Sequence, residues 1–266
     1  MRKIGLIAGG GDLPLEFVRS VKSHGDKIIV FALKDMALSQ IEKEADKTYW
    51  MEIGQYRKFG FLLLTNRIRE LVLMGKVDKK VIYKEGKYDR EYSGSLKKLE
   101  NKKDYSILGE ITRHLRRIGV EVIDGIEYLS HLFPEKGVLS ETLPDNRIEE
   151  DIAFGYEIVK KLADMDIGQT VVVKEKTIVA VEAMEGTDST ISRAGSIAGA
   201  GCVMVKVSRP RQDMRWDVPT VGPDTMRRLC ENRFSAIAIE NNRMFMLDRP
   251  EFIRGADENN LVVKVI

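Results

Sequence analysis

Residues 3–33, KIGLIAGGGDLPLEFVRSVKSHGDKIIVFAL, decide the fold of the first half of the chain. The apolar runs at 3–8 and 27–33 predict two buried strands. Between them Asp12 can cap a helix, and Pro14 lies in its first turn, where the missing N–H of proline costs nothing. Strand, glycine turn, helix and strand in this order form a βαβ unit, and its crossover implies a parallel sheet.

Short apolar runs and helical periodicity continue to alternate after this unit. The pattern predicts strands at 49–53, 70–74 and 120–123, and helices at 56–68 and 105–117. The stretch 78–104 is rich in Lys, Glu, Tyr and Gly and has poor periodicity, which is typical of a long loop. The sequence therefore predicts a doubly wound α/β domain, a Rossmann-like parallel sheet covered by helices, over residues 1–133.

The second half begins after a stretch with few periodic apolar positions, residues 134–148, which we interpret as a linker. Residues 149–266 then predict a mixed α/β domain, with a first helix at 149–162. Six strands are expected, with hairpin turns at Lys174-Glu175-Lys176 and at Asn241-Asn242. The predicted strands are 170–173, 177–181, 202–207, 236–239, 244–247 and 261–265.

Composition narrows the class of protein. The 266 residues are 43% hydrophobic and 32% charged, which predicts a globular protein of more than one domain. The 43 basic and 41 acidic residues nearly cancel, so nothing suggests a broad basic face for nucleic acid. Cys202 and Cys230 lack metal or redox spacing, and three scattered histidines argue against a zinc centre. With neither a signal peptide nor a membrane span recognisable, we expect a cytoplasmic protein.

The glycine turn at Gly9, Gly10 and Gly11 is where a nucleotide phosphate could bind, because free N–H groups and the helix dipole attract anions. The dinucleotide fingerprint G-x-G-x-x-G is broken here, since Pro14 stands where the third glycine belongs. Asp35 fits the position of a ribose ligand only loosely. Binding of NAD or FAD, another nucleotide contact and a purely structural turn all stay open.

A second unusual stretch is 206–224, KVSRPRQDMRWDVPTVGPD, which follows a predicted strand. Three prolines and a glycine keep it out of regular structure. It sets carboxylates among cations, and such a mixture suits a divalent ion with a polyphosphate, although a salt-bridged loop is the alternative. The carboxylates are those of Asp213, Asp217 and Asp224, and the cations are Lys206, Arg209, Arg211 and Arg215.

A further acidic group, Glu182, Glu185 and Asp188, lies beside the start of a predicted helix. Both acidic segments follow strands, so one sheet edge can bring them together. Such a cluster suits Mg²⁺ or Mn²⁺, which would offset the charge of a pyrophosphate and lower the pKa of an attacking water. No nucleophile motif such as G-x-S-x-G is present. Metal-assisted hydrolysis is therefore the leading prediction, with the leaving phosphate stabilised by Arg193, Arg209, Arg211 and Arg215.

Six motifs occur in a characteristic order, and together they resemble the LpxI family, the UDP-2,3-diacylglucosamine pyrophosphatases of lipid A biosynthesis. They are LIAGGGDLP (6–14), EIGQ (52–55), MGKV (74–77), DIGQTVVV (166–173), VAVEAMEGTD (179–188) and QDMRWDVPTVGPDT (212–225). The resemblance covers nearly the whole chain. It is interrupted at 78–103, where little of the family's usual sequence is recognisable.

The resemblance implies hydrolysis of UDP-2,3-diacylglucosamine to UMP and 2,3-diacylglucosamine 1-phosphate (lipid X), with Mg²⁺ (or Mn²⁺) and two α/β domains. It implies a catalytic aspartate in R-x-D-x-P-T, which is Asp217 here, and we assign Arg215 and Asp213 to catalysis beside it. Glu182, Glu185 and Asp188 match the family's E-A-x-E-G-T-D motif, and we assign them, with Asp217, as metal ligands. The substrate-binding residues we assign are Gly9, Gly10, Gly11, Asp12, Gly75, Lys76, Gln169, Thr187, Lys206, Thr220 and Gly222.

The expected partner is a lipid-linked UDP-sugar, and no nucleic acid is expected. A homodimer and a peripheral contact with the inner face of the membrane are left open. The position of an acyl-chain cavity is also open, because Met184, Met204 and Met214 could equally be core residues. Two other classes of function compete: a non-catalytic nucleotide-sugar sensor, which would not need the acidic cluster, and an NAD-dependent oxidoreductase, which the broken fingerprint disfavours.

Overall fold

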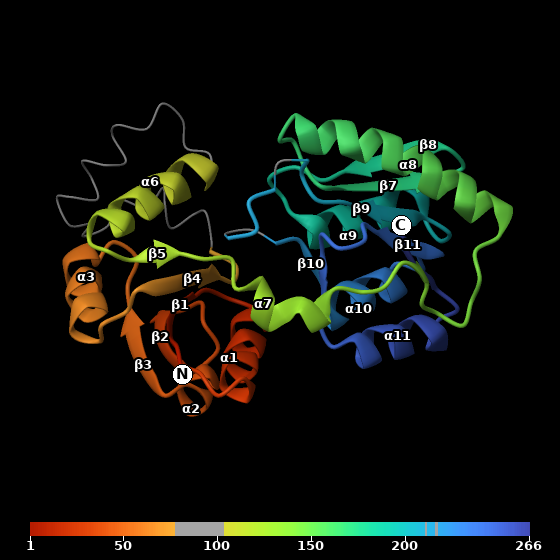
Figure 1. Ribbon diagram of the computed structural model, residues 1–266. Coiled ribbons are helices and arrows are strands. Elements are labelled where there is room, and N and C mark those ends of the chain that lie inside the picture. Colours follow the sequence, from red (N-terminus) through yellow and green to blue (C-terminus); the bar gives the residue numbers. More distant parts are fainter. Residues whose placement is uncertain (78–103, 211, 216–217) are drawn as a thin grey trace. The chain divides into compact units, whose positions relative to one another are not determined.

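The computed structural model describes residues 1–77, 104–210, 212–215 and 218–266 (Figure 1). The chain forms two compact units, one built from Met1–Leu129 and Met214–Asp217 and the other from Ser130–Asp213 and Val218–Ile266. Both are α/β units, as the sequence predicts. The predicted limits of the domains and linker, 1–133, 134–148 and 149–266, stay a prediction.

The first unit contains a five-stranded sheet in the order β3-β2-β1-β4-β5. Every neighbouring pair is parallel, which confirms the prediction from the βαβ unit. The strand order reverses between β1 and β4, the place where open α/β sheets bind ligands at their carboxyl edge. The strands are β1 Lys3–Ala8, β2 Lys27–Leu33, β3 Lys47–Met51, β4 Glu70–Met74 and β5 Glu121–Val122.

Helices cover both faces of this sheet. Ile29 and Phe31 of β2 share one apolar cluster with Leu63 of α3 and Leu115 of α6. On the other face Phe17 of α1 and Val72 of β4 both lie close to Gly125. Alternate residues of each strand thus face opposite helix layers, as the period of a strand requires. The helices are α1 Leu13–Ser23, α2 Ile41–Glu44, α3 Tyr56–Thr65, α6 Asp104–Arg117 and α7 Ile126–Leu129.

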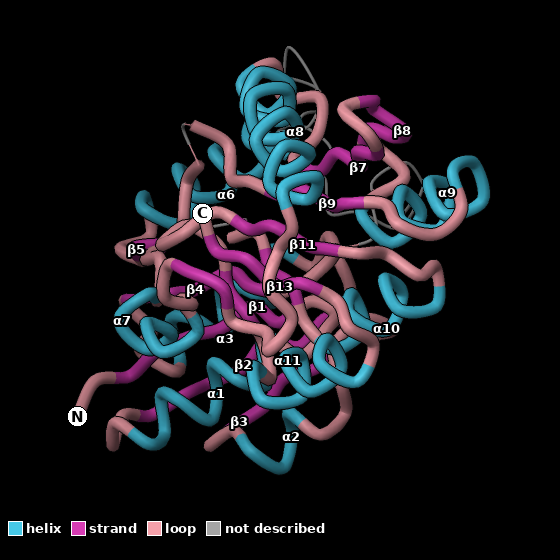
Figure 2. The backbone as a smooth tube through the Cα atoms, turned by 90° about the vertical axis from the view of Figure 1, so that its right-hand side faces the viewer, coloured by secondary structure: helices cyan, strands magenta, loops and turns pink. Residues whose placement is uncertain are grey.

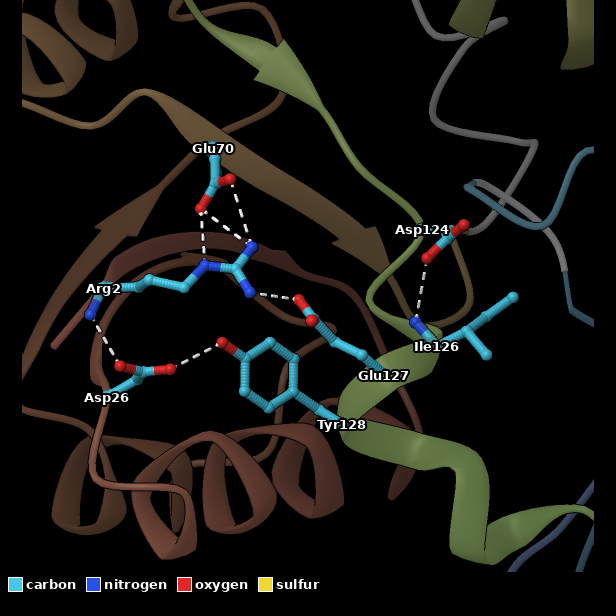
Figure 3. A network of polar contacts seen from close by, with 7 residues as sticks. All are labelled: Arg2, Asp26, Glu70, Asp124, Ile126, Glu127 and Tyr128. Carbon is cyan, nitrogen blue, oxygen red and sulfur yellow. Dashed lines mark hydrogen bonds and ion pairs between the residues drawn. The ribbon is translucent and has the colours of Figure 1, made fainter.

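A polar network joins the amino ends of β1, β2 and β4 to α7 (Figure 3). The Arg2 guanidinium donates two 3.1 Å bonds to the Glu70 carboxylate and also pairs with Glu127. Asp26 accepts from the Arg2 amide at 2.6 Å and from the Tyr128 hydroxyl at 2.8 Å, and these bonds lower the pKa of Asp26. The network lies at the end of the sheet opposite to the glycine turn, so we assign it to stability.

The second unit contains a six-stranded mixed sheet in the order β6-β13-β11-β9-β7-β8. Strands β9, β11 and β13 are parallel to one another, whereas β6, β7 and β8 pair antiparallel. This confirms the predicted mixed α/β class. The strands are β6 Gly137–Val138, β7 Thr170–Lys174, β8 Thr177–Val181, β9 Val203–Lys206, β11 Ala236–Ile239 and β13 Val262–Val265.

Four helices flank this sheet, and Figure 2 shows α8 on the side opposite to α10 and α11. Residues of α8 pack with Val171, Val203 and Val205, and residues of α9, α10 and α11 pack with Val172 and Met204 on the other face. In the described ranges no helix combines the length and apolarity that a bilayer crossing requires. The helices are α8 Asn146–Asp164, α9 Thr187–Ala198, α10 Pro223–Glu231 and α11 Arg249–Glu258, besides the 3-10 turn Ser130–Leu132.

One predicted hairpin is wrong. Asn241-Asn242 does not join two paired strands, because β12 (Phe245–Met246) pairs in parallel with β10 (Thr220–Val221) in a separate two-stranded sheet. The physical reason is that β11 already has β9 and β13 on its two edges, so no edge is left for a hairpin partner. Within the stretch predicted as a linker, β6 adds an edge strand to the second sheet.

The predicted hairpin between β7 and β8 is confirmed, but its turn has two residues rather than three. Glu175 and Lys176 both have positive φ, 52° and 54°, as a type I′ turn requires. Neither residue favours that conformation, and the turn is held by Asp151 of α8, which is 2% exposed. The Asp151 carboxylate accepts from the Glu175 amide at 3.0 Å and from the Lys176 amide at 2.6 Å.

We expect Asp151→Ala to lower the free energy of unfolding by about 2–3 kcal/mol, because it removes the charged acceptor of both turn amides. The adjacent Glu150 gives a matched control, since it pairs with Lys176 in an ion pair whose two side chains are both 57% exposed. Glu150→Ala should cost less than about 1 kcal/mol. Urea unfolding measures both, and equal losses for the two variants would contradict the role given to Asp151.

Candidate functional site

Polar side chains gather at one edge of the second sheet, where β8 and β9 end. β9 ends with Lys206, and β8 is followed directly by Glu182. Because β7 runs antiparallel to both, its first residue, Thr170, lies at the same edge and pairs in register with Lys206. The structure brings three of the predicted site residues, Glu182, Thr187 and Lys206, together at this edge.

Lys206 is the centre of this group and is only 6% exposed. Its ammonium donates to the Thr187 hydroxyl at 2.7 Å and to the Thr170 hydroxyl at 3.2 Å. The Thr187 hydroxyl in turn donates to Glu182 Oε1 at 2.8 Å, and Glu182 Oε2 lies 3.8 Å from the ammonium. The result is a nearly buried ion pair bridged by a threonine at the start of α9.

The Glu182 carboxylate is held ionised in this setting. Burial alone would raise its pKa, but the Lys206 charge and the threonine hydroxyls outweigh burial and hold the pKa below its ordinary value. Within the described residues Glu182 Oε2 is a buried atom that accepts no hydrogen bond. A buried carboxylate oxygen with spare accepting capacity can take a donor from a ligand or a water.

Gly168 allows the chain to pass beside Glu182. A Cβ atom at residue 168 would lie 1.9 Å from the Glu182 carbonyl oxygen, closer than any side chain can approach. The two segments are tied by the Glu182 amide, which donates to the Thr170 carbonyl at 2.9 Å. The glycine of the DIGQ motif is therefore required by packing under the site.

Arg209 is fixed just beyond β9. Its Nε donates to Asp166 Oδ1 at 2.8 Å. With the Gln169 amide turned so that its oxygen faces Arg209, Gln169 accepts from Arg209 Nη1 at 3.2 Å and donates to the Val207 carbonyl at 3.2 Å. The predicted site residue Gln169 thus positions a guanidinium whose side chain is 21% exposed. A positioned guanidinium at a sheet edge is well suited to phosphate.

Three of the four carboxylates predicted to share a metal pair separately with three cations. Glu182 lies by Lys206, Glu185 accepts from Arg193 at 2.6 Å, and Asp188 lies 3.4 Å from Arg228 of α10. Over the described ranges no three His, Cys, Asp or Glu side chains are arranged to hold a metal ion. Glu182, Glu185 and Asp188 therefore do not form a preassembled cation site, and holding one ion with all three would break three ion pairs.

Glu240, which directly follows β11 at the same edge, was not among the site residues predicted from the sequence. Its carboxylate accepts from the Ser208 amide at 2.8 Å, the Ser208 hydroxyl at 2.9 Å and the Lys160 ammonium at 2.8 Å. Burial would raise the pKa of Glu240, but Lys160 and Ser208 lower it below its ordinary value. Glu240 thus anchors the start of the segment after β9. An acidic residue directly after a buried apolar strand was the available signal.

The remaining predicted residues of the segment 206–224 do not join the group around Lys206 in the described part of the chain. Asp213 and Arg215 are half-buried, while Arg211 and Asp217 lie outside the described residues. The Thr220 hydroxyl donates to the Val218 carbonyl at 3.0 Å, and Gly222 caps α10 in an extended conformation. Asp224 pairs with Arg227 on the exposed side of α10. The predicted catalytic aspartate thus has no described surroundings.

In the first unit, the glycine turn after β1 packs against the turn after β4. The Gly9 amide donates to the Met74 carbonyl, and the Gly10 amide donates to the Lys76 carbonyl, both at 2.8 Å. A Cβ atom on Gly9 would lie 2.6 Å from the Lys76 carbonyl oxygen, and one on Gly75 (φ 97°) would lie 2.8 Å from the Gly9 carbonyl carbon. These glycines allow two backbones to meet at the strand-order reversal.

This packing changes what the glycine turn can offer a ligand. The Gly9 and Gly10 amides are already bonded to carbonyl groups of the protein, so the predicted phosphate contact is reduced to Gly11 and the start of α1. Gly11 has φ 90° and faces open space. Asp12 occupies the cap position of α1 but makes no side-chain capping bond, and Lys76 is exposed.

Family models match both halves of the chain. Residues 3–132 match the model of the LpxI N-terminal domain, and residues 135–264 match that of the LpxI C-terminal domain. The chain is 28% identical over 275 residues to a Caulobacter vibrioides protein named UDP-2,3-diacylglucosamine pyrophosphatase LpxI, covering 99% of this chain and 97% of that protein.

Solved structures resemble the chain only weakly. The biotin carboxylase domain of a thermophilic 2-oxoglutarate carboxylase with ADP is 12% identical with a TM-score of 0.29, over 64% of this chain and 34% of that chain. The biotin carboxylase subunit of pyruvate carboxylase is 14% identical with a TM-score of 0.29, over 68% of this chain and 36% of that chain. The chain spans about a third of each, and the similarity is too low to carry an argument.

Proposed function

The chain belongs to the LpxI family, whose two domain models together match residues 3–132 and 135–264, and from this premise we propose that it is a UDP-2,3-diacylglucosamine pyrophosphatase of lipid A biosynthesis. The consecutive match of both domains carries the proposal. The relative from Caulobacter vibrioides, aligned over 99% of this chain, supports it.

In the proposed reaction, water adds to one phosphorus of the pyrophosphate and the bridging P–O bond breaks. The products are UMP and 2,3-diacylglucosamine 1-phosphate, and the proton lost by water is released to solvent or taken up by a neighbouring base. Negative charge grows on the bridging oxygen that leaves, so positioned cations and N–H groups accelerate such a step. The sheet edge that carries Lys206 and Arg209 supplies this kind of group.

We assign Lys206, Thr187 and Thr170 to phosphate binding in this proposal. The ammonium is held by two hydroxyls at 2.7 and 3.2 Å, so little freedom is lost when a phosphate joins them. Thr187 begins α9, where backbone N–H groups and the helix dipole favour an anion. Arg209, held by Asp166 and Gln169, is the second cation at this edge.

A divalent ion, Mg²⁺ or Mn²⁺, is part of the proposal on chemical grounds. A bound pyrophosphate carries charge that such an ion offsets, and Mg²⁺ takes most of its ligands from water and phosphate oxygens. It therefore needs one or two carboxylates rather than a set of three. Asp217 is the proposed ligand and catalytic residue. The carboxylates of Glu182, Glu185 and Asp188 would join only by leaving their own cations.

UMP release from UDP-2,3-diacylglucosamine by the purified chain tests the proposal, with Mg²⁺, without added metal and with EDTA. We expect release that depends on the metal and stops with EDTA. Release that is indifferent to EDTA would remove the metal from the proposal while keeping the reaction. Tight binding of the UDP-sugar without UMP release would mean that the chain is a non-catalytic nucleotide-sugar sensor.

We propose that the protein acts on the cytoplasmic side of the membrane.

A further inference from the structure

A groove of about 340 Å³ runs between α3 and α6 of the first unit. We call it the α3–α6 groove. Its floor belongs to the apolar cluster that attaches both helices to the sheet, with Leu63 and Leu115 fully or almost fully buried. Its lining is mainly apolar and aromatic, and it includes Tyr56, Phe59, Phe61, Ile111, His114 and Ile118.

Large apolar side chains continue from the groove onto the exposed surface. Phe61 is 66% exposed, Leu64 is 59% exposed, and Ile118 is 36% exposed. Phe61 and Leu64 lie one turn apart on α3, whereas Leu63 between them is fully buried. One exposed leucine needs no explanation, but an exposed phenylalanine, leucine and isoleucine beside one groove form, among the described residues, an apolar patch of the kind that interaction sites use.

The charge around these helices favours an anionic partner. Residues 56–69 and 104–118, which include both helices, together contain seven Lys and Arg and two acidic residues, which is a net charge of 7 − 2 = +5. The whole chain carries +2, so all its other residues together carry 2 − 5 = −3. Of the two acidic residues, Glu110 pairs with Arg113. Lys58, Arg116 and Arg117 are exposed on the same two helices.

We propose that the α3–α6 groove and its basic surroundings dock the protein on an anionic lipid surface. Phe61, Leu64 and Ile118 would enter the headgroup region, and the cations would contact lipid phosphates. A second copy of the chain is disfavoured as the occupant, because it would bring two strongly positive surfaces together. The inference rests on the proposed function only in that a lipid-linked substrate gives such docking a purpose.

Docking can be measured without any hydrolysis. The full chain is sedimented with vesicles of phosphatidylcholine alone and with vesicles that also contain phosphatidylglycerol, at about 0.1 M salt, where the Debye length is about 10 Å. We expect binding to the anionic vesicles, little binding to the neutral ones, and weaker binding as salt rises. Binding to both kinds alike, or to neither, would overturn the proposal.

Variants locate the surface. Phe61→Ser/Leu64→Ser is expected to lower the vesicle partition coefficient at least about tenfold, and Lys58→Glu/Arg116→Glu to lower it similarly, because apolar insertion and charge act together. The matched control is Met165→Ser/Ile167→Ser, which removes two apolar side chains that are 59% and 46% exposed in the second unit. Equal loss in the control, or full binding by both groove variants, would refute the assignment.

The outcome is separable from that of the proposed function. UMP release from substrate dispersed in detergent should be unchanged in both groove variants, because neither alters the Lys206 edge, and this also shows that they are folded. If the chain binds anionic vesicles but releases no UMP, the docking proposal stands and the proposed pyrophosphatase activity is rejected. If the chain releases UMP but does not bind anionic vesicles, the activity stands and the docking proposal is rejected.

Discussion

Lys206→Met is expected to lower kcat/KM for UMP release by about 100-fold or more, measured at a temperature where the variant remains folded. Removing one positioned electrostatic contact from a developing charge typically costs 10²–10³ in rate. Lys206 qualifies as such a group because its ammonium is buried and held by two hydroxyls. Methionine keeps the length and apolar stem of lysine, so the change removes mainly the charge.

The same substitution should also reduce stability, and the two effects can be separated. The side chains of Lys206 and Glu182 are 7% and 13% exposed, so removing the lysine leaves a buried carboxylate without its cation. Breaking a buried pair in this way costs about 3–5 kcal/mol. Lys206→Met/Glu182→Met replaces the pair by two apolar side chains, which should restore most of the stability but not the activity.

Urea unfolding and initial rates of UMP release, measured on wild type and both variants, decide between the roles. If activity returns with stability in the double variant, the pair is only structural. Lys174→Met is the matched control, because its ammonium bonds the Ala198 carbonyl at the other end of β7. It should keep nearly full activity. Asp217→Ala provides the reference for a catalytic loss, with turnover abolished and ligand affinity mostly intact.

The fold could be predicted where the signal is local. The apolar runs 3–8 and 27–33, with the glycine turn and a helix between them, correctly predicted a parallel unit, because a helical crossover returns the chain to start the second strand in the same direction. The pairing of β12 with β10 could not be predicted in this way. It depends on the occupied edges of β11, which are set by β9 and β13 from distant parts of the sequence.

The candidate site shows the same division. The segments that carry Glu182 and Lys206 were expected at one sheet edge because both follow strands, whereas the pairing of these two side chains, whose strands β8 and β9 are separated by β7, was not predicted. Sequence spacing could not show the partners of the acidic residues, since Asp188 meets Arg228 only through the packing of α9 on α10. The glycine turn likewise looked open for a phosphate, and its closure depends on Gly75, which is more than sixty residues away along the chain.

Gly168→Ala is expected to lower the free energy of unfolding by about 3 kcal/mol or more and to abolish most UMP release. The new methyl group would lie 1.9 Å from the Glu182 carbonyl oxygen and 2.7 Å from its carbonyl carbon, and backbone atoms cannot turn aside as a flexible side chain can. Overpacking that forces a backbone shift typically costs 1–3 kcal/mol and occasionally more. Here the shift would move Glu182 away from Lys206 and Thr187.

Gly60→Ala separates this steric effect from the general effect of replacing glycine. Gly60 lies inside α3, and a Cβ atom there meets no atom within 4 Å. Alanine should therefore stabilise the chain by about 0.5–1 kcal/mol, since glycine is the poorer helix former. Urea unfolding and UMP release are measured for both variants. A Gly168→Ala protein as stable and active as wild type would mean that residues 168 and 182 are not in contact, and the placement of Glu182 beside Lys206 would then have to be given up.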